Sequence, residues 1–409
     1  MSADARLDET AIAAAVERAI VLRRRMHRHP ETGLRLPRTQ TLVADELRAL
    51  DIPLVLGRSS DSVVGLIRGG RPGPTVLLRA DMDALPIDEE TDLPFSSETP
   101  GAMHACGHDL HTAGLLGAAA LLRRAAEELA GAVVLMFQPG EEGWFGARHM
   151  IDEGVTGPPS NGLPAPSRAF ALHVNPWYPL GTVNMRGGAI LAAADTFRIV
   201  LTGAAGHGSA PHAAVDPIPA ACELVGAIQT MVARTNPPFD PAVVSVTGLA
   251  AGSAEARSAI PGSAEITGTF RTHSVARRVA TEAGLRGRAA GIAAAHGLDV
   301  EVEIHRGYPA TLNDPAVVDA LRPVLELRIP AGVNILADPL MGSEDFSYVL
   351  EQIPGVLAFV GTTPVEKLAE GWPADNHSAR VDYDERAVDA FIRAHLAFVA
   401  AHQTGEHAA

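Results

Sequence analysis

Cysteine is scarce in this sequence, because only Cys106 and Cys222 occur among its 409 residues. Two cysteines cannot form the disulfide framework with which small secreted domains compensate for a small core. A chain of this length instead has enough residues for two domains with apolar cores of their own. We therefore expect a protein of a reducing compartment, the cytoplasm, whose fold depends on packing rather than on disulfides.

The sequence also lacks a long apolar run and an excess of basic residues. Its apolar stretch Ala113–Leu122 is far shorter than the roughly 20 residues that span a bilayer, and the first residues lack the pattern of a secretory signal peptide. The formal net charge is -15, whereas nucleic-acid binders normally present a basic face. We therefore expect neither a membrane nor a nucleic acid as a partner.

Short apolar segments alternate with helix-like segments over much of the chain. This alternation predicts an α/β fold in which helices cover a mostly parallel sheet. Two long helices are expected, at Ala11–Arg28 and at Ala113–Ala130, the second closed by Gly131 as a C-terminal cap. A final amphipathic helix is expected after residue 387. The strands expected in the sheet are Ser62–Arg68, Thr75–Arg79, Ala132–Phe137, Ala169–Val174 and Val356–Val360.

Between residues 186 and 306 the order changes to strand, helix, strand, strand, helix, strand. This order is the split βαβ arrangement (βαββαβ) of a ferredoxin-like unit. It predicts a small domain inserted into a larger one, as insertions sit on surface loops whose ends lie close together. We expect a catalytic domain formed by residues 1–185 and 307–409, and an inserted lid domain formed by residues 186–306. The expected elements of the lid domain are Thr196–Leu201, Pro217–Arg234, Val243–Leu249, Ala264–Arg271, Val275–His296 and Val300–His305.

Acidic, histidine and cysteine residues gather in four segments near the ends of predicted strands. Asp83 follows the strand that ends at Arg79, and Glu141 and Glu142 follow the strand that ends at Phe137. His173 lies within another strand, and a further segment, MHACGHDLH, directly precedes a helix. Ligands bind beyond the carboxyl ends of the strands in open α/β sheets. The coincidence of four such segments therefore predicts a functional site at this edge.

Each of these residues also has a purely structural interpretation. A lone histidine such as His173 in an apolar strand is more often a hydrogen-bonded core residue, and a lone cysteine such as Cys106 is more often a small buried hydrophobic residue. Cys106 and His108 have a spacing that suits Zn²⁺ or Mn²⁺ binding from one loop, but this spacing alone is a weak signal. The four segments together favour a metal site over the separate structural interpretations.

Seven motifs of the sequence, in this order, resemble those of the M20 metallopeptidases. Within that family they resemble the amidohydrolase branch, which includes hippurate hydrolases, N-acyl-amino-acid hydrolases and plant auxin-conjugate hydrolases. The Cys-x-His form of the metal loop is typical of this branch. The motifs are RADMDALPI (79–87), MHACGHDLHT (103–112), FQPGEEG (137–143), ALHVNPWYPLGTV (171–183), GHGSAPH (206–212), GSEDFS (342–347) and NHSARVDYDERA (376–387).

The resemblance implies a site with two divalent metal ions per subunit, Zn²⁺ or Mn²⁺, with Co²⁺ or Ni²⁺ as alternatives. The five ligands that it implies are Cys106, His108, Glu142, His173 and His377. Five ligands for two ions require that one ligand bridges, and the anionic, polarisable thiolate of Cys106 is the candidate. Glu141 matches the general base that takes a proton from the metal-bound water and passes it to the leaving amine.

The resemblance also implies roles outside the metal ligands. His207 matches a lid-domain histidine that reaches the active site of a neighbouring subunit, which implies a homodimer through the lid domain, and it could donate a hydrogen bond to the oxyanion. Arg271 resembles a residue that holds a substrate carboxylate. Asp83 could orient a metal ligand, although a strand-end cap is an equal alternative, and Asp109 is expected to be a helix cap or a partner of a ligand. Ser258 stands where related sequences usually have asparagine.

The resulting functional hypothesis is hydrolysis of an N-acyl or N-aroyl amino acid to a carboxylic acid and a free amino acid. An exopeptidase, either a dipeptidase or a carboxypeptidase, is a close alternative that would use the same two metal ions. A binding protein that retained the metal site would not need Glu141 beside its ligands. A metal-free cysteine hydrolase would need Cys106 and His108 as nucleophile and base, but residues two apart on one loop are poorly placed for that.

Overall fold

The computed structural model describes residues 8–157 and 162–402, and these form two compact units. The larger unit contains residues up to Gly188 together with Leu312–Asp338 and the residues from Asp345 onwards. The smaller unit contains Ala189–Thr311 and Pro339–Glu344. Part of the N-terminal segment that was considered for a signal peptide, residues 1–7, lies outside the described residues. No described helix combines the length and the apolar character that crossing a membrane requires.

The larger unit is built on an eight-stranded sheet with the order β1-β2-β4-β3-β5-β16-β6-β15. Its four central strands, β4, β3, β5 and β16, are parallel to one another, whereas β2 runs antiparallel to β4 and β6 antiparallel to β16. The predicted α/β fold with a large, mostly parallel sheet is therefore confirmed. The strands are β1 (Leu54–Leu56), β2 (Val63–Arg68), β3 (Arg71–Asp81), β4 (Ala130–Gln138), β5 (Arg168–Pro179), β6 (Val183–Met185), β15 (Val333–Ile335) and β16 (Gly355–Thr363).

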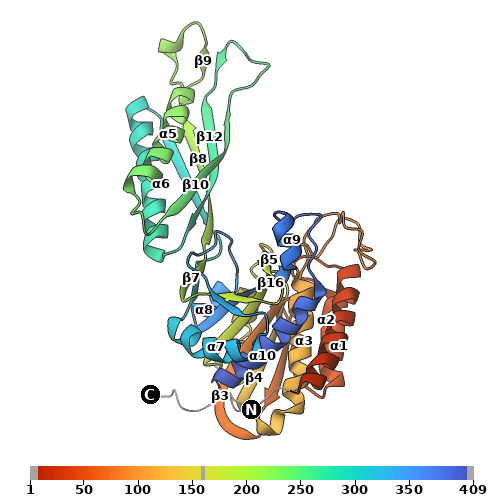
Figure 1. Cartoon of the computed structure of the whole chain (residues 1–409). Helices are drawn as coiled ribbons and strands as arrows, with labels where there is room; N and C mark the ends of the chain where they lie inside the picture. The colour runs from red at the N-terminus through yellow and green to blue at the C-terminus, as the bar shows by residue number, and fades with distance from the viewer. Residues whose placement is uncertain (1–7, 158–161, 403–409) are drawn as a thin grey trace. The chain divides into compact units, whose positions relative to one another are not determined.

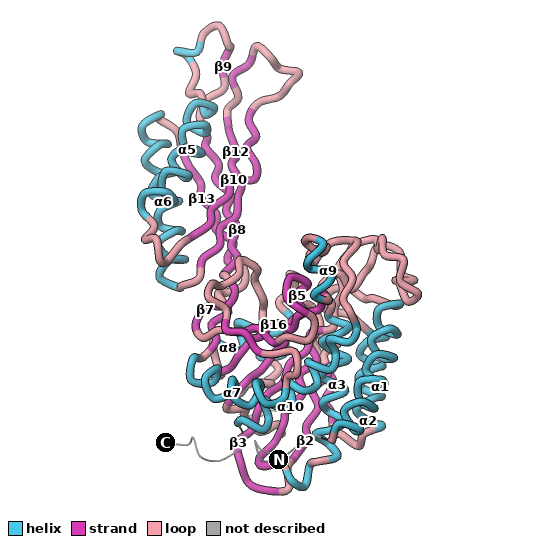
Figure 2. Tube along the Cα trace, viewed as in Figure 1, coloured by secondary structure: helices cyan, strands magenta, loops and turns pink. Residues whose placement is uncertain are grey.

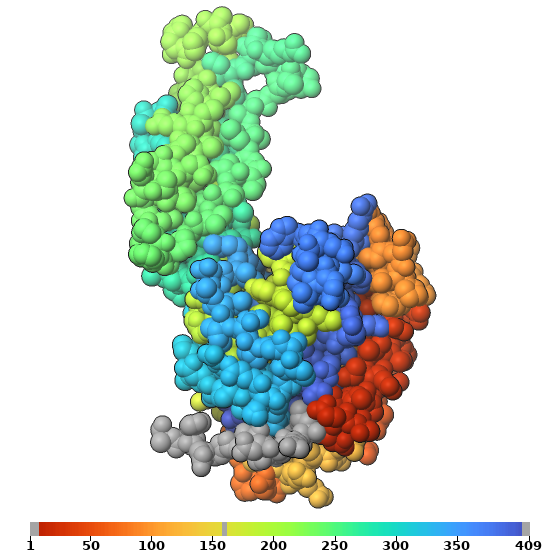
Figure 3. Space-filling view, in the orientation of Figure 1, coloured from red at the N-terminus to blue at the C-terminus, as the bar shows by residue number. Residues whose placement is uncertain are grey.

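Helices α1, α3 and α10 of the larger unit pack against one another, and α3 and α10 also contact strands β3 and β5 (Figure 1). The first and the last described helices, α1 and α10, therefore lie side by side, as the red and blue atoms of this unit show (Figure 3). Strand β16 is buried along its whole length, which explains its continuous apolar sequence. The helices of this unit are α1 (Glu9–Arg28), α2 (Pro37–Ala49), α3 (His108–Arg124), α4 (Gly146–Asp152), α7 (Pro315–Arg328), α8 (Ser347–Leu350), α9 (Val365–Glu370) and α10 (Val388–His402).

Two helices differ from the sequence-based prediction. Helix α3 begins at His108 and ends at Arg124, so the predicted helix at Ala113–Ala130 is wrong at both ends. Gly131 is not a helix cap, because it lies in β4 with φ of +75°, and a Cβ atom there would lie 1.8 Å from the carbonyl oxygen of Pro74. Helix α10 is not amphipathic, since it is buried on nearly all sides between its neighbouring helices and the sheet.

The smaller unit contains a four-stranded antiparallel sheet with the order β10-β12-β8-β13. Helices α5 and α6 pack on one face of this sheet (Figure 2), and apolar residues such as Phe197, Leu224 and Leu285 form the core between them. The elements follow along the chain as β8 (Ala193–Thr202), α5 (Pro217–Thr235), β10 (Ala242–Ala251), β12 (Ser263–Thr272), α6 (Val275–His296) and β13 (Asp299–Arg306). The short strands outside this sheet are β7 (Gly188–Leu191), β9 (Gly206–His207), β11 (Ala259–Ile260) and β14 (Thr311–Asn313).

Candidate metal centre

The five candidate metal ligands come from four segments of the larger unit. Cys106 lies just before α3, and His108 is the first residue of that helix, so the prediction that both lie in one loop is wrong for His108. Glu142 follows the end of β4, His173 lies in β5, and His377 lies in the loop between α9 and α10. His377 has a φ of +67°, a conformation that a residue with a side chain rarely adopts and that often marks a functional position.

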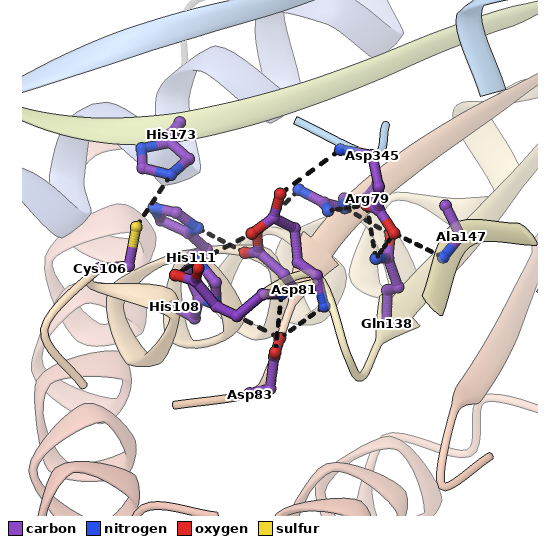
Figure 4. Close-up of polar contacts among 12 residues, drawn as sticks. Arg79, Asp81, Asp83, Cys106, His108, His111, Gln138, Ala147, His173 and Asp345 are labelled. Atoms are coloured by element: carbon purple, nitrogen blue, oxygen red, sulfur yellow. Dashed lines mark hydrogen bonds and ion pairs between the residues drawn. The ribbon is translucent and has the colours of Figure 1, made fainter. Parts of the chain in front are cut away.

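The donor atoms of these residues form two groups that share Cys106. The donor atoms of Cys106, His108 and His173 all lie within 4.8 Å of one another, and so do those of Cys106, Glu142 and His377. The Cys106 Sγ lies 3.4 Å from the His173 Nε2 (Figure 4), and the His377 Nε2 lies 3.2 Å from the Glu142 Oε1. A sulfur shared by two three-residue groups is an arrangement that could accommodate two neighbouring cations, and sulfur, imidazole and carboxylate donors suit Zn²⁺.

A hydrogen bond to the backbone determines which ring nitrogen of His173 could bind a metal ion. Its Nδ1 donates to the carbonyl oxygen of Val174 at 2.7 Å, so its Nε2 keeps a lone pair directed at the side of Cys106. Such a bond from the other ring nitrogen is typical of metal-binding histidines. His108 has a different environment, because it is fully buried and neither ring nitrogen makes a hydrogen bond among the described residues. Carboxylate oxygens of Asp81 and Asp83 lie 3.4 Å from its two ring nitrogens. A buried imidazole without a hydrogen bond is costly, and a bound cation would reduce that cost.

The electrostatic field of the site is negative. Burial lowers the pKa of His108, but the carboxylates of Asp81, Asp83 and Glu142 outweigh this effect and raise that pKa to about 10. Burial and the carboxylates of Glu142, Glu141 and Asp81 raise the pKa of the Cys106 thiol well above its usual value. A field that favours a proton on His108 and disfavours a free thiolate equally favours a divalent cation, which would let Cys106 ionise.

Asp83 connects the predicted base to a candidate ligand. Its Oδ1 accepts a hydrogen bond from the backbone N–H of Glu141 at 3.0 Å, and its Oδ2 accepts one from the N–H of Glu142 at 3.1 Å. Its Oδ1 also lies 3.4 Å from the Nδ1 of His108. These contacts are compatible with both alternatives that the sequence left open for Asp83, orienting a ligand and capping a strand end.

Glu141, the predicted base, is 5% exposed and lies at the turn after β4. Its Oε1 lies 3.4 Å from the backbone nitrogen of Asp345, which donates to it. The carboxylates of Glu141 and Glu142 both lie within 4.8 Å of a donor atom of His108, and Glu142 also forms a group with Cys106 and His377. This difference allows one glutamate to bind a cation while the other handles protons.

A buried polar network beside the site was not found from the sequence. The guanidinium of Arg79 donates to Gln138 at 2.9 Å, to Asp81 at 2.8 Å and to Asp345 at 3.1 Å (Figure 4). Asp345 also accepts from the side chain of Gln138 and, at 2.9 Å, from the N–H of Ala147. The available signal was a charged residue at the end of an apolar strand, because buried charges need partners. Arg79 and Asp345 are both in the quoted motifs, but no role was predicted for either.

Two further polar residues near the candidate ligands, His111 and Asp109, have structural partners. His111 donates from Nδ1 to Asp81 at 2.5 Å and accepts at Nε2 from the N–H of Val174 at 2.9 Å, so both of its nitrogens are occupied. Burial is the main cause that lowers the pKa of His111 to about 4, and His111 is therefore a neutral support of the site. Asp109 is not a helix cap, because its carboxylate lies 2.7 Å from Arg23 and 2.8 Å from His27.

His207, Arg271 and Ser258 belong to the smaller unit. The Nδ1 of His207 accepts from the backbone N–H of Ser209 at 3.1 Å, which leaves the proton of a neutral ring on Nε2. Arg271 lies on β12, where burial lowers its pKa, and it donates to Thr269. Ser258, at the position of the asparagine of related sequences, accepts at its carbonyl oxygen from the N–H of Gly208 at 2.7 Å.

Comparison with known proteins defines the class. A model of the peptidase family M20/M25/M40 matches residues 77–400 of the chain, and the chain belongs to this family. It is accordingly a hydrolase that acts on amide or peptide bonds, and the predicted family membership and enzyme class are confirmed.

Two relatives and one solved structure are similar to this chain over most of its length. Thermostable carboxypeptidase 1 of Saccharolobus solfataricus is 38% identical over 380 residues, which cover 92% of this chain and 93% of the relative. The N-acetylcysteine deacetylase of Bacillus subtilis is 37% identical over 356 residues, which cover 86% of this chain and 90% of the relative. A solved dinuclear metal-binding peptidase of the M20 family from Bacillus subtilis is 33% identical with a TM-score of 0.80, covering 95% of this chain and 98% of its own.

Proposed function

We propose that this protein hydrolyses the amide bond of N-acyl or N-aroyl amino acids and releases a carboxylic acid and a free amino acid. The observation that carries the proposal is the buried glutamate Glu141, whose carboxylate lies within 4.8 Å of donor atoms of His108 and Glu142, beside the five candidate ligands. A protein that only binds metal has no need for such a group. The cytoplasm remains the predicted compartment.

Cys106, His108, Glu142, His173 and His377 would hold two divalent cations, Zn²⁺ or Mn²⁺, with Co²⁺ or Ni²⁺ as alternatives. Cys106 is the candidate for the bridging position because it belongs to both groups of donor atoms. When bound, such cations polarise the amide carbonyl and make water more acidic.

In this proposal, side chains of the protein carry out the proton transfers and position the substrate. Glu141 takes a proton from the attacking water and delivers it to the nitrogen of the leaving amine, a role worth about 10²–10⁴ in rate. Asp83 holds the backbone N–H groups of Glu141 and Glu142 and so positions both glutamates. His207 would donate from Nε2 to the oxyanion, and Arg271 would hold the carboxylate of the substrate.

The smaller unit is the proposed lid and dimerisation domain, with a ferredoxin-like fold. Its order of elements, β8-α5-β10-β12-α6-β13, supports this assignment. In this proposal His207 serves the active site of the partner subunit in a homodimer. Mixing His207→Ala subunits with Glu141→Ala subunits tests it, because each heterodimer would then contain one complete site. Recovery of activity on mixing supports a shared site, whereas two inactive variants that stay inactive after subunit exchange contradict it.

An exopeptidase is the second candidate function, and the resemblance to thermostable carboxypeptidase 1 favours it. The two reactions share the released amino acid and differ in the group on the other side of the amide bond. A carboxypeptidase accepts a peptide there, whereas an acyl-amino-acid hydrolase accepts a simple acyl group.

A substrate panel with one released amino acid separates the two functions. Metal-reconstituted protein is assayed for release of phenylalanine from N-acetyl-phenylalanine, N-benzoyl-phenylalanine and alanyl-phenylalanine, with chelated protein as the control. We expect kcat/KM to be at least about tenfold higher for an acyl derivative than for the dipeptide, a difference of about 1.4 kcal/mol. The reverse order would support the exopeptidase, and hydrolysis of none would contradict both.

A further inference from the structure

All three tryptophans of the chain lie within five residues of Glu142, His173 or His377 in the sequence. Trp144 follows Glu142 by two residues, Trp177 follows His173 by four, and Trp372 precedes His377 by five. Their exposed fractions are 57%, 42% and 83%. Tryptophan has the largest apolar side chain and is usually well buried, so exposed tryptophans are characteristic of surfaces that bind a ligand or partner.

Trp177 and Trp372 form a pair although 195 positions of sequence separate them. Their ring centroids are 5.7 Å apart, and the ring planes are inclined at 68°, which is the edge-to-face geometry that aromatic rings prefer. Trp177 is on β5. Helix α9 contacts β5 and ends at Glu370, and Trp372 follows it after Gly371. The pair is therefore a defined structure and not two independent surface residues.

The position of the pair connects it to the metal centre within the larger unit. His173, Asn175 and Trp177 all lie in β5, whose pairing with β16 is irregular between Asn175 and Pro179. Asn175 fixes the backbone at this point, because its Oδ1 accepts from the N–H of Trp177 at 2.8 Å. The four residue steps from His173 to Trp177 span at most about 13 Å along a strand. An acetyl group covers little of this distance, whereas an aromatic acyl group directed along β5 covers more of it and extends towards the pair.

Trp372 also lines a cavity of about 560 Å³, together with Phe95, Pro364 and Pro373. Tyr383 is also among the lining residues, and its hydroxyl donates to the carbonyl oxygen of Ala105, the residue before Cys106, at 2.9 Å. The lining also includes charged residues such as Arg23, Lys367 and Glu385, so apolar and charged side chains share this cavity. Aromatic faces of this kind offer contact area for a planar apolar group and few hydrogen bonds for a polar one.

We propose that Trp177 and Trp372 form a subsite for a large apolar acyl group, and that the protein therefore prefers N-aroyl over N-acetyl amino acids. This inference rests on the proposed amidohydrolase function. It assigns the specificity for the acyl group to two residues outside the metal-binding set. The shorter acyl groups make no contact with the pair and serve as an internal reference.

The test compares substrates that share one amino acid and differ in the acyl group: N-acetyl-, N-benzoyl- and N-(2-naphthoyl)-alanine. For Trp372→Ala and Trp177→Ala we expect kcat/KM for the two aroyl substrates to fall about tenfold, mainly through KM, while N-acetyl-alanine is hydrolysed as before. Trp372→Phe should recover part of the loss because it keeps an aromatic ring. Phe239→Ala, which removes a fully exposed aromatic residue of the smaller unit, is the matched control.

A binding measurement provides a second readout that does not depend on turnover. Benzoate and acetate are titrated into the metal-loaded protein, and tryptophan fluorescence is recorded. If benzoate quenches the fluorescence of the wild type but not that of Trp372→Ala, the subsite is supported. If benzoate quenches the wild type, Trp372→Ala and Trp177→Ala equally, the subsite is contradicted. An equal loss on acetyl and aroyl substrates would also overturn the inference, as would a loss that follows the amino-acid side chain when N-acetyl-phenylalanine replaces N-acetyl-alanine. Failure of the wild type to hydrolyse any N-acyl amino acid would instead overturn the proposed function.

Discussion

Replacing Asp83 with asparagine perturbs the structure between the base and the metal centre with almost no change in volume. In the wild type, one carboxylate oxygen accepts from the N–H of Glu141 at 3.0 Å, and the other accepts from the N–H of Glu142 at 3.1 Å. An asparagine side chain has one acceptor oxygen and one NH₂ group. Whichever way it is oriented, its NH₂ group faces a backbone N–H, and the negative charge 3.4 Å from the Nδ1 of His108 is lost.

The magnitude follows from these contacts. A hydrogen bond to a charged acceptor contributes about 1.5–3 kcal/mol, and an unsatisfied buried donor costs about 1–3 kcal/mol. We therefore expect Asp83→Asn to lower the free energy of unfolding of the metal-free protein by about 2–4 kcal/mol. Removing a group that orients a ligand typically weakens metal binding about 10–100-fold, and we expect the same loss here.

Urea denaturation of the metal-free protein and metal titration measure the two effects. Asp88→Asn is the matched control, because Asp88 is an exposed carboxylate close by in the sequence that accepts from the N–H of Gly101. The control should change stability by no more than about 0.5 kcal/mol. If Asp83→Asn behaves like the control in both measurements, Asp83 does not position the site and this reasoning is refuted.

Two other changes test the buried charges around the site. Arg79→Met should destabilise the protein by about 3–5 kcal/mol in denaturant unfolding, because it leaves the buried carboxylates of Asp81 and Asp345 without their cation; a loss under about 1 kcal/mol would contradict the role of the network. Glu89 tests the pH dependence: burial raises its pKa, but hydrogen bonds, the largest from His27, outweigh burial and lower the pKa to about 2. Because the folded-state pKa lies below the unfolded value, Glu89 stabilises the fold above about pH 4.5, and this contribution disappears as the pH falls towards 2. The difference in unfolding free energy between wild type and Glu89→Gln should therefore be about 1–3 kcal/mol at pH 7 and shrink below pH 4.5, whereas a constant difference would contradict the assignment.

The sheet was predictable because its strands are buried on both faces and so have continuous apolar sequences. The first turn of α3 was not, because His108, Asp109 and His111 are polar residues that are buried for the site. Their side chains hide the apolar period on which a helix prediction depends. Helix α10 was predicted with the wrong environment, since one apolar face is visible in sequence but burial of the opposite face depends on packing partners that are distant in the chain.

Sequence alone brought several candidate donors to one edge of the sheet, and family resemblance added His377. The structure shows that the donor atoms of the five candidates lie close together, while their roles as ligands remain predictions. The contacts that orient them could not be predicted, because they join distant positions. Arg79 and Asp345, for example, are 266 residues apart. The tautomers of His173 and His207 likewise depend on hydrogen bonds of specific backbone groups.

The account's central claim is that Glu141 is the base and Glu142 the ligand. Glu141→Gln keeps the size of the side chain and removes its ability to take a proton, so its kcat on the best N-acyl amino acid is the most direct measurement. We expect kcat to fall by about 10²–10⁴ while the number of bound metal ions per chain stays as in the wild type. Glu142→Gln, in contrast, should lose metal. Turnover by metal-loaded Glu141→Gln at close to the wild-type rate would contradict the claim.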